Sequence, residues 1–382
     1  MASRIWLLSA RGEHDCAHPA APDATSRSPI HHAHILRVLL GALLAVACGG
    51  GVDTTTGDGA VGDAASAPDA RTVRLPDASG GRDGGGPGDL GAPYPIVLAH
   101  GFFGFEDFAG VSFITYFYGV KDDLAERGEP LVFTPAVDPF NDSETRGEQL
   151  LAHVERILAE TGHAKVNLIG HSQGGLDARY VAAMRPDLVE SVTTFATPHR
   201  GTPIADVVVG LVEDERARDL ADRLVRLIGA ALYDAAGEET SVFASLRQLS
   251  TPGMDEFNAR YPNQEGIAYY SLTGRSDRHD GDPDCDAPDR PRFVYTHDRD
   301  LDPIEPLLDI AEQIVDGGSA DIVNDGLVRV RDARWGRFLG CVPADHFDEI
   351  GHLFGDSPGR GNDWNHQAFY ADLVAYLRTQ GH

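Results

Sequence analysis

The segment KVNLIGHSQGGLDARYVAA (165–183) decides the fold of this chain. Its first part, KVNLIG (165–170), is a short continuous apolar run of the kind that forms a strand buried on both faces. LDARYVAAMRP (176–186) follows and predicts a helix that its terminal proline ends. Between them lies GHSQG (170–174), which has the form G-x-S-x-G. A strand, this pentapeptide and a helix in that order predict a sharp turn that projects the hydroxyl of Ser172 above a sheet.

The same alternation of apolar runs and helical patterns continues on both sides of this segment. Because strands that alternate with helices form a mostly parallel sheet covered on both faces, the expected fold class is α/β. Further strands are expected at 95–100, 130–137, 191–197 and 267–274, and further helices at 108–128, 145–162 and 369–380.

Composition divides the chain into three parts. Residues 1–48 end in the apolar run ILRVLLGALLAVAC (35–48), which has the length of a signal-peptide core and is too short to span a bilayer. Cys48 follows small residues, as in a bacterial lipoprotein signal, so lipidation of Cys48 and ordinary cleavage with release both stay open. Residues 49–93 hold almost no large apolar side chain and predict a flexible linker. Residues 94–382 are the expected folded domain of an exported protein, anchored in the cell envelope or secreted.

Charge and cysteine content limit the classes of partner. The chain carries 59 acidic and 32 basic side chains, a formal net charge of −27, which repels nucleic acid. We therefore expect no nucleic-acid partner. None of the four cysteines forms a C-x-x-C pair, so a zinc knuckle or a thioredoxin-type site is not expected. Cys285 and Cys341 are the two cysteines of the folded part, and they can pair in an exported protein. Two unpaired thiols are the alternative.

Five ordered segments carry a family resemblance: YPIVLAHGFFG, RGEQLLAHV, KVNLIGHSQGGLDARYVAA, SVTTFATPHRGTP and HFDEIGHLFG. Together they resemble the Pseudomonas/Burkholderia-type bacterial triacylglycerol lipases, and the similarity is weakest in 205–300. The resemblance implies an α/β-hydrolase fold with a helical lid at 204–249. It also implies a carboxylic ester hydrolase that acts on lipid at the lipid–water interface through a Ser-Asp-His triad and an acyl-enzyme. A short-chain esterase, a polyester or phospholipid hydrolase with the same triad, and a surface binding protein without turnover are the alternatives.

Ser172 needs a base and an orienting carboxylate, because an unassisted hydroxyl is a poor nucleophile. In α/β-hydrolases these follow the serine in the order acid, then histidine. His346, in DHFDE, resembles the base segment of the family, and His366 is the competing base. Asp325, in Asn-Asp-Gly, matches the family's catalytic acid, and Asp277 is the competing acid.

The developing oxyanion needs hydrogen-bond donors beside the nucleophile. The backbone N–H groups of Phe102, after the strand at 95–100, and of Gln173, after the nucleophile, are the expected donors. We expect the side chain of His100 to have a structural role.

The resemblance further implies a structural Ca²⁺ that fixes the loop of the catalytic histidine. Asp302 and Asp348 would supply carboxylates to an oxygen-rich shell. His352, where the family has Gln, and Asp356 complete the expected group. Lipid or ester substrate is the expected partner, with a membrane anchor through Cys48 and a folding helper left open.

Overall fold

The computed structural model describes residues 90–102, 116–212, 214–217, 219–220, 242–276, 283–295, 300, 302–317, 319, 321–351, 358–359 and 361–382. All of them belong to one compact unit, Ala78–His382. The expected leader and most of the expected linker lie outside the described residues, as do Cys48, Asp277, His352 and Asp356. None of the helices in the described ranges is long and apolar enough to cross a bilayer.

Six parallel strands form the central sheet, in the order β2-β1-β3-β4-β5-β6. The strands are β1 (Ile96–Ala99), β2 (Val132–Phe133), β3 (Val166–His171), β4 (Val189–Phe195), β5 (Ala268–Gly274) and β6 (Arg337–Val342). The chain runs from β1 outward to β2 and then back across β1 to β3. Because the strand order reverses here, the chain leaves the carboxyl ends of β1 and β3 in opposite directions. Open α/β sheets bind their ligands in the crevice at such a reversal point.

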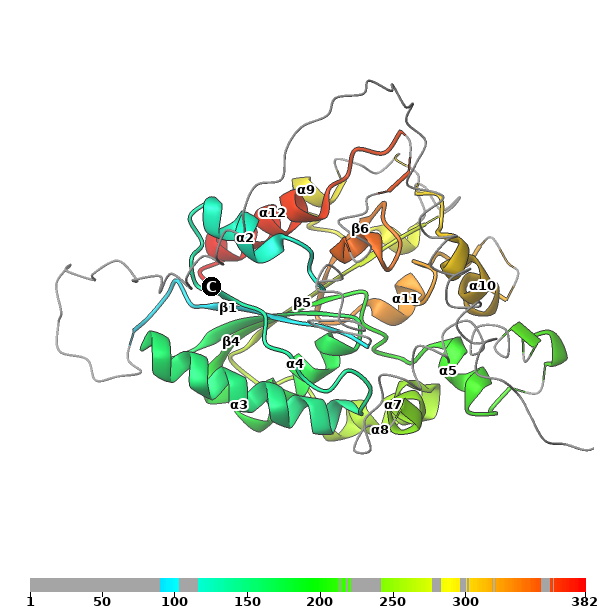
Figure 1. Cartoon of the computed structure of the whole chain (residues 1–382), viewed down its shortest axis with the longest axis horizontal. Helices are drawn as coiled ribbons and strands as arrows, with labels where there is room; N and C mark the ends of the chain where they lie inside the picture. The colour runs from blue at the N-terminus through cyan, green and yellow to red at the C-terminus, as the bar shows by residue number, and fades with distance from the viewer. Residues whose placement is uncertain are drawn as a thin grey trace, which may run out of the picture. The chain divides into compact units, whose positions relative to one another are not determined.

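Helices cover both faces of the sheet (Figure 1). Their bounds are α2 (Val120–Glu126), α3 (Ser143–Thr161), α4 (Gln173–Met184), α5 (Pro203–Val208), α7 (Val242–Leu249), α8 (Thr251–Arg260), α9 (Arg292–Tyr295), α10 (Pro306–Val315), α11 (Val330–Ala333) and α12 (His366–Thr379). Three short 3₁₀ turns lie at Pro186–Leu188, Pro283–Cys285 and Asp348–Ile350. Helices α3 and α4 pack on one face, and α2 and α12 pack together on the other.

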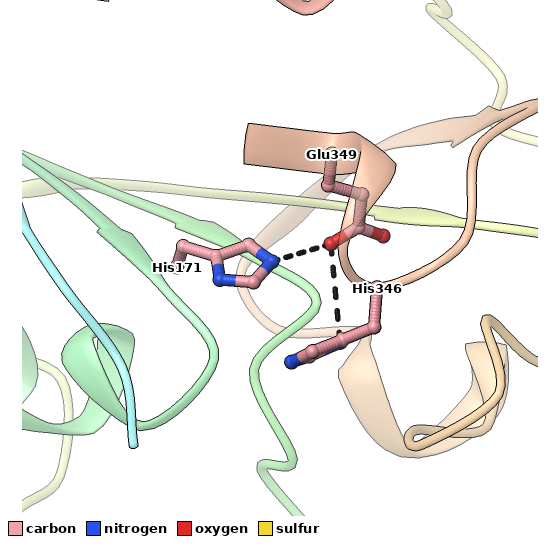
Figure 2. Close-up of side chains that lie close together, drawn as sticks. All are labelled: His171, His346 and Glu349. Carbon is pink, nitrogen blue, oxygen red and sulfur yellow. Dashed lines mark hydrogen bonds and ion pairs between the residues drawn. The ribbon is translucent and has the colours of Figure 1, made fainter. Parts of the chain in front are cut away.

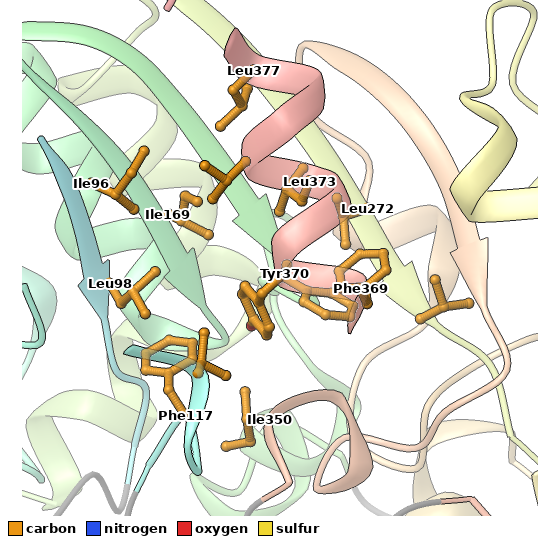
Figure 3. Close-up of a cluster of buried hydrophobic side chains, with 14 of the residues drawn as sticks. Ile96, Leu98, Phe117, Ile169, Leu272, Ile350, Phe369, Tyr370, Leu373 and Leu377 are labelled. Carbon is orange, nitrogen blue, oxygen red and sulfur yellow. The ribbon is translucent and has the colours of Figure 1, made fainter. Parts of the chain in front are cut away.

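Strand β1 shows why the sheet sits at the centre of the molecule. Ile96 and Leu98 contact the core under α12, whereas Val97 and Ala99 contact the core under α3 and α4. Figure 3 shows the first of these cores, with side chains of α12 over the strands. Both faces of the strand are fully buried, as the continuous apolar run predicted. Each such Ile or Leu side chain stabilises the fold by about 1.5–3 kcal/mol.

The predicted α/β architecture is confirmed, with differences in the length of single elements. Helix α3 begins two residues before the predicted 145–162 helix and ends one residue before its predicted end. Its start is set by Asp142, whose side chain caps the helix by accepting a hydrogen bond from the N–H of Thr145 at 2.8 Å. Strand β2 keeps only two of the eight residues expected at 130–137. Strand β6 was not predicted, since it begins at exposed Arg337 and contains Gly340.

Cys285 and Cys341 form a disulfide, with their Cα atoms 5.2 Å apart. It joins the 3₁₀ turn before α9 to strand β6 across 56 residues of sequence. Val323 and Val330 pack with the two cysteines in one buried cluster. The bridge therefore fixes the segment that leads into β6 and the loop after it.

Candidate active site

Ser172 occupies a strained turn between β3 and α4, with φ 54° and ψ −131°. A non-glycine residue in such a conformation costs roughly 1–3 kcal/mol. Gly170 and Gly174 make the turn possible, because a Cβ at Gly170 would collide with the carbonyl of Gly174, and a Cβ at Gly174 with the carbonyl of Ala99. Two hydrogen bonds hold the turn: the Ser172 N–H donates to Phe195 O at 2.8 Å, and Thr197 Oγ1 donates to Ser172 O at 2.7 Å.

His346 and Asp325 lie side by side in the loops after β6 and before α11. Nδ1 of His346 donates to Oδ2 of Asp325 at 2.9 Å, and both side chains are almost completely buried. Asp325 is itself fixed, because its Oδ1 accepts from the N–H groups of Leu327 at 2.9 Å and Val328 at 2.7 Å. With its proton on Nδ1, the imidazole has Nε2 available as a proton acceptor. This is the pairing that a general base needs.

The ring of His346 also lies close to the nucleophile turn. Its centroid is 4.5 Å from the ring centroid of His171, the residue before Ser172. The predicted base and the predicted acid are thus brought together beside the predicted nucleophile. The competing base His366 is held elsewhere, at the start of α12, where its Nε2 donates to Tyr118 O at 2.7 Å. The competing acid Asp277 lies outside the described residues.

Glu349 is a buried residue of this site that the sequence did not single out (Figure 2). Its Oε2 lies 2.6 Å from Nε2 of His171 and 4.0 Å from Nδ1 of His346. Its Oε1 accepts from the N–H of Gly274 at 2.6 Å. Burial, and then the charge of Asp325, raise the pKa of Glu349 well above its usual range. Glu349 is one of three acidic residues around His346, with Asp345 and Asp348, and no sequence signal distinguished it from the other two.

A hydrogen-bonded chain extends from Glu349 to the loop after β1. Tyr116 Oη lies 2.7 Å from Nδ1 of His171, whose other nitrogen meets Glu349. Burial raises the pKa of Tyr116, so the phenol keeps its proton and donates it to Nδ1. The 2.6 Å bond between His171 Nε2 and Glu349 Oε2 holds one proton between the two groups, and the raised pKa of Glu349 favours that proton on the carboxyl.

His171, His346 and Glu349 are spaced closely enough to be compared with a metal site. Two ligands of one tetrahedral zinc ion lie about 3.3 Å apart, given metal–ligand distances near 2.0–2.1 Å. The 2.6 Å between His171 Nε2 and Glu349 Oε2 is shorter and has the length of a charge-assisted hydrogen bond. His171 and Glu349 are therefore joined by a hydrogen bond, and His346 lies beside this pair.

The loop after β1 carries the first expected oxyanion donor and packs against the nucleophile. A Cβ at Gly101 would lie 2.6 Å from Cβ of Ser172, so this loop and the serine are in close contact. His100 fixes the loop by donating from Nδ1 to Gly101 O at 2.9 Å and accepting the Val137 N–H at Nε2, at 3.0 Å. Burial, and then the charge of Arg146, lower the pKa of His100 to about 3. Its side chain is thus a neutral structural element.

Arg146 anchors the same loop from α3. Its Nη2 donates to His100 O at 2.6 Å, and its Nε donates to Oδ2 of Asp177 on α4 at 2.9 Å. Both charged side chains are fully buried. Removing one partner of such a pair costs about 3–5 kcal/mol, because the other charge stays buried. The pair joins α3, α4 and the loop after β1 into one rigid support.

Gln173, the second expected oxyanion residue, begins α4. Its backbone N–H has no acceptor within the helix, because the first N–H groups of a helix have none. Its side chain is buried and donates to Asn141 O at 2.8 Å, while its Oε1 accepts from Ser245 Oγ of α7 at 3.3 Å. The described end of the expected lid region 204–249 therefore contacts the residue that follows the nucleophile; residues 221–241 lie outside the described ranges.

A second acidic cluster lies behind His346. One carboxylate oxygen each from Asp302, Asp345 and Asp348 lies within 4.8 Å of the others, and all three residues are buried. Neither oxygen of Asp302 receives a hydrogen bond of ordinary geometry. Burial, and then the charge of Asp345, raise the pKa of Asp302 to about 8. Three buried carboxylates with an unsatisfied member fit a hard divalent cation such as Ca²⁺.

Asp302 and Asp348, two of the four residues expected at this cluster, are thus close together. Asp345 lies with them and was not predicted from the sequence. His352 and Asp356 lie outside the described residues. Asp345 Oδ1 accepts from the N–H groups of Phe347 at 2.9 Å and Asp348 at 3.1 Å, so it also shapes the turn that follows His346.

Comparisons with known proteins agree with this geometry. The α/β-hydrolase fold family matches residues 94–269. A triacylglycerol lipase of Vibrio cholerae is 37% identical over 281 residues, which cover 69% of this chain and 81% of that protein. A triacylglycerol lipase of Pseudomonas fragi is 32% identical, over 70% of this chain and 92% of that protein. The crystal structure of a metagenomic carboxyl esterase shares the fold, with a TM-score of 0.50 and 17% identity over 80% of this chain and 82% of that one. The chain belongs to the bacterial triacylglycerol lipase family of the α/β-hydrolase fold.

Proposed function

We propose that this chain hydrolyses triacylglycerols through a triad of Ser172, His346 and Asp325. The observation that carries the proposal is the 2.9 Å bond between His346 and Asp325, with the His346 ring 4.5 Å from the ring of His171, the residue before a serine on a strained turn. The relatives that match most of their own length are named triacylglycerol lipases, which supports the substrate class.

The geometry supports a two-step reaction through an acyl-enzyme. His346 takes the proton of Ser172 as the serine oxygen attacks the ester carbonyl, and it returns that proton to the leaving alcohol. Asp325 holds the imidazole in the required tautomer and stabilises the imidazolium. The backbone N–H groups of Phe102 and Gln173 bind the developing oxyanion. Water then attacks the acyl group with His346 acting as base again.

Apolar surface near α5 and α7 supports action at a lipid–water interface. Phe243, on α7, is 59% exposed, and Leu211, after α5, is 53% exposed. Helix α7 also contacts Gln173 through Ser245, so a movement of α7 reaches the oxyanion residue directly. We assign 204–249 as a lid that opens on lipid, in line with the gating role of such segments.

Covalent labelling and emulsion hydrolysis test the proposal together. The protein should react with a fluorophosphonate probe at Ser172 and should hydrolyse an emulsified long-chain triacylglycerol. Ser172→Ala should lose both properties and keep its fold by circular dichroism. An unlabelled wild-type protein would refute the triad, whereas a labelled protein active only on dissolved short-chain esters would restrict the function to an esterase.

A calcium ion belongs to the same proposal. Asp302 and Asp348 would hold it, with Asp345 beside them, and its charge would neutralise the buried carboxylates and fix the loop of His346. Asp302 supports this assignment, since its two carboxylate oxygens have no hydrogen bond of ordinary geometry. The amount of calcium retained after gel filtration, measured by mass spectrometry on wild type and Asp302→Asn, tests it.

The proposal places the enzyme outside the cytoplasm, released or anchored through Cys48. The apolar run at 35–48 and the small residues before Cys48 are its support. Metabolic labelling with palmitate tests the anchor: wild type should incorporate label and Cys48→Ser should not. A released, unlabelled protein with an intact disulfide would favour secretion.

A further inference from the structure

A cationic pocket interrupts the acidic surface of this protein. The pocket has a volume of about 590 Å³, and Arg200, Arg334 and Arg337 are among the residues that line it, together with Trp335. Among its described lining residues Asp289 is the one acidic side chain. The whole chain carries a formal net charge of −27, so a pocket with three arginines has a local charge opposite in sign to that of the chain. Such a local field favours an anionic ligand.

The pocket is separate from the catalytic residues. Trp335 and Gly336 lie directly before β6, and Asn263, another lining residue, lies before β5. They therefore stand at the amino ends of these strands. Arg200 follows the carboxyl end of β4 and reaches this region by donating to the carbonyl oxygens of Arg331 and Arg334. Ser172 and His346 follow the carboxyl ends of β3 and β6, which is the opposite edge of a parallel sheet. The mechanism above makes no use of the pocket.

The arginines of the pocket are positioned by neutral groups. Nη1 of Arg200 donates to the carbonyl oxygens of Arg331 and Arg334. Nη1 of Arg334 donates to Asp284 O at 3.2 Å, and its guanidinium lies 4.5 Å from the ring centroid of Phe338. These partners orient each guanidinium and leave its charge in place.

Acidic side chains near the pocket neutralise it only weakly. Arg337 and Asp289 form an ion pair with 3.8 Å between nitrogen and oxygen, and 43% and 77% of the two side chains are exposed. An exposed pair at this distance neutralises little of the arginine's charge. Asp332 lies near Arg200, but its ion pair is with Arg331 at 3.9 Å. The pocket therefore keeps a surplus of positive charge.

A fourth guanidinium lies behind Trp335. Arg179 is 2% exposed, and its Cζ is 3.7 Å from the centroid of the Trp335 ring. Its hydrogen-bond partners are Asn258 Oδ1, Tyr261 O and His199 Nδ1, at 2.9–3.1 Å, and none of them is a carboxylate. No ion pair of Arg179 occurs within the described part of the chain, and burial lowers its pKa to about 9. A buried cation without a counter-ion is costly, and an anion in the adjacent pocket would offset that cost.

We infer that this pocket binds a phosphate monoester. A guanidinium group binds phosphate oxygens through two parallel N–H groups, and three arginines against one aspartate leave a surplus of two positive charges. A phosphate monoester carries about −1.5 to −2 at neutral pH, whereas a carboxylate carries one charge. The volume exceeds that of a phosphate alone and falls within the range of roughly 300–1,000 Å³ for ligand pockets, so it also holds the organic part of the ester.

Calorimetric titration of the full chain with glycerol 3-phosphate tests the inference. Ionic strength near 0.15 M keeps the screening length at about 8 Å, so that distant acidic groups do not mask the pocket. Wild type should show saturable binding, and Arg334→Gln should weaken it about tenfold or more. Arg337→Gln should do the same, and this second variant removes only a wide ion pair and an amide contact of 3.5 Å. Arg156→Gln, on the exposed face of α3, is the matched control and should bind as wild type does.

A second experiment, sedimentation with vesicles, distinguishes a lipid headgroup from a soluble phosphate ester as the ligand. Sedimentation with phosphatidylcholine vesicles that contain phosphatidic acid, dependent on Arg337 and absent with phosphatidylcholine alone, supports a lipid headgroup. Binding of glycerol 3-phosphate in solution without vesicle binding supports a soluble ester. Absence of both, equal affinity for acetate, or an equal loss in Arg156→Gln would overturn the inference.

Discussion

Nε2 of His171 lies 2.6 Å from Oε2 of Glu349, and this bond joins the residue before Ser172 to the loop that carries His346. The same Glu349 oxygen is 4.0 Å from Nδ1 of His346, while Asp325 is 2.9 Å from that nitrogen. Two carboxyl groups therefore lie near one imidazole N–H, and the charge of Asp325 is one cause of the raised pKa of Glu349. Asp325 makes the direct hydrogen bond, and Glu349 places a second acceptor within a small side-chain movement.

The two carboxylates should show non-additive effects on catalysis. Asp325→Asn should lower kcat by less than the roughly 10⁴-fold loss that this change causes in a protease triad, because Glu349 can approach the freed imidazole. Glu349→Gln alone should cost about tenfold or less, since its amide oxygen can still accept the Gly274 N–H. The double variant should lose more than the product of the two single losses. Rates on a soluble ester measure this, and simple multiplication of the losses would show that Glu349 gives no such support.

Replacement of His346, the proposed base, and of His366, the competing base, should give different results. His346→Ala should reduce kcat to the residual level left by the oxyanion donors, as loss of the general base does in other triads. His366→Ala should keep kcat within a fewfold and lower stability, because its Nε2 donates to Tyr118 O between α12 and the segment before α2. Steady-state kinetics measure kcat of both variants, and urea unfolding measures their stability. An active His346→Ala protein would move the base to another residue.

The sequence predicted the features of this protein that are encoded locally. Gly170, Ser172 and Gly174 specify the nucleophile turn within five residues, and the apolar runs of β1 and β3 are continuous because both faces of those strands are buried. Strand β2 was overestimated, since only two residues of a longer apolar run pair with β1.

The remaining parts of the site depend on contacts that are remote in sequence. Glu349 and His171 are 178 residues apart, and nothing in a chain with 59 acidic residues marks that glutamate. Asp345 has a local role as a turn former and a distant role beside Asp302. The first is readable from its neighbours, and the second requires the fold that brings residue 302 to residue 345.

Reduction of the disulfide should destabilise the catalytic domain. Cys285 and Cys341 close a loop across 56 residues, and chain entropy gives such a closure about 4 kcal/mol. We expect urea unfolding in the presence of a reductant to show a loss of that order. The Cys285→Ser/Cys341→Ser protein should start at the lower stability and should not respond to reductant. Equal stability of wild type with and without reductant would contradict the prediction.

Chelation of calcium should lower the thermal stability of the wild-type enzyme. A cation at roughly one hundred times its Kd stabilises a protein by about 2.7 kcal/mol, which corresponds to a shift in Tm of roughly 4–5 °C for a domain of about 290 residues. Ca²⁺ should restore the Tm better than Mg²⁺, which demands a stricter geometry. Asp302→Asn should respond little to chelator, because it removes a carboxylate and its charge from the cluster. A Tm that ignores the chelator would rule out the ion.

Acid should loosen the oxyanion loop through His100. Burial, followed by the charge of Arg146, lowers the pKa of this imidazole from 6.5 to about 3 in the folded protein. The unfolded chain therefore binds a proton first, so the stabilisation is present above pH 6.5 and is lost as the pH falls towards 3, at about 1.4 kcal/mol per pH unit. His100→Gln should have a shallower slope of unfolding free energy against pH, by about one proton, in urea titrations between roughly pH 4 and 7.

The same protonation should affect catalysis before the protein unfolds. A protonated His100 cannot accept the Val137 N–H at Nε2, so the loop that presents the Phe102 N–H loses one of its anchors. Since Arg146 still holds His100 O at 2.6 Å, the loop should become mobile while the core stays folded. Any triad base gives both proteins an acid limb in kcat. Below that limb, near pH 3, we expect the wild type to show a further loss of kcat while circular dichroism is unchanged, and His100→Gln should lack this further loss. The same further loss in both proteins would place the titrating group elsewhere.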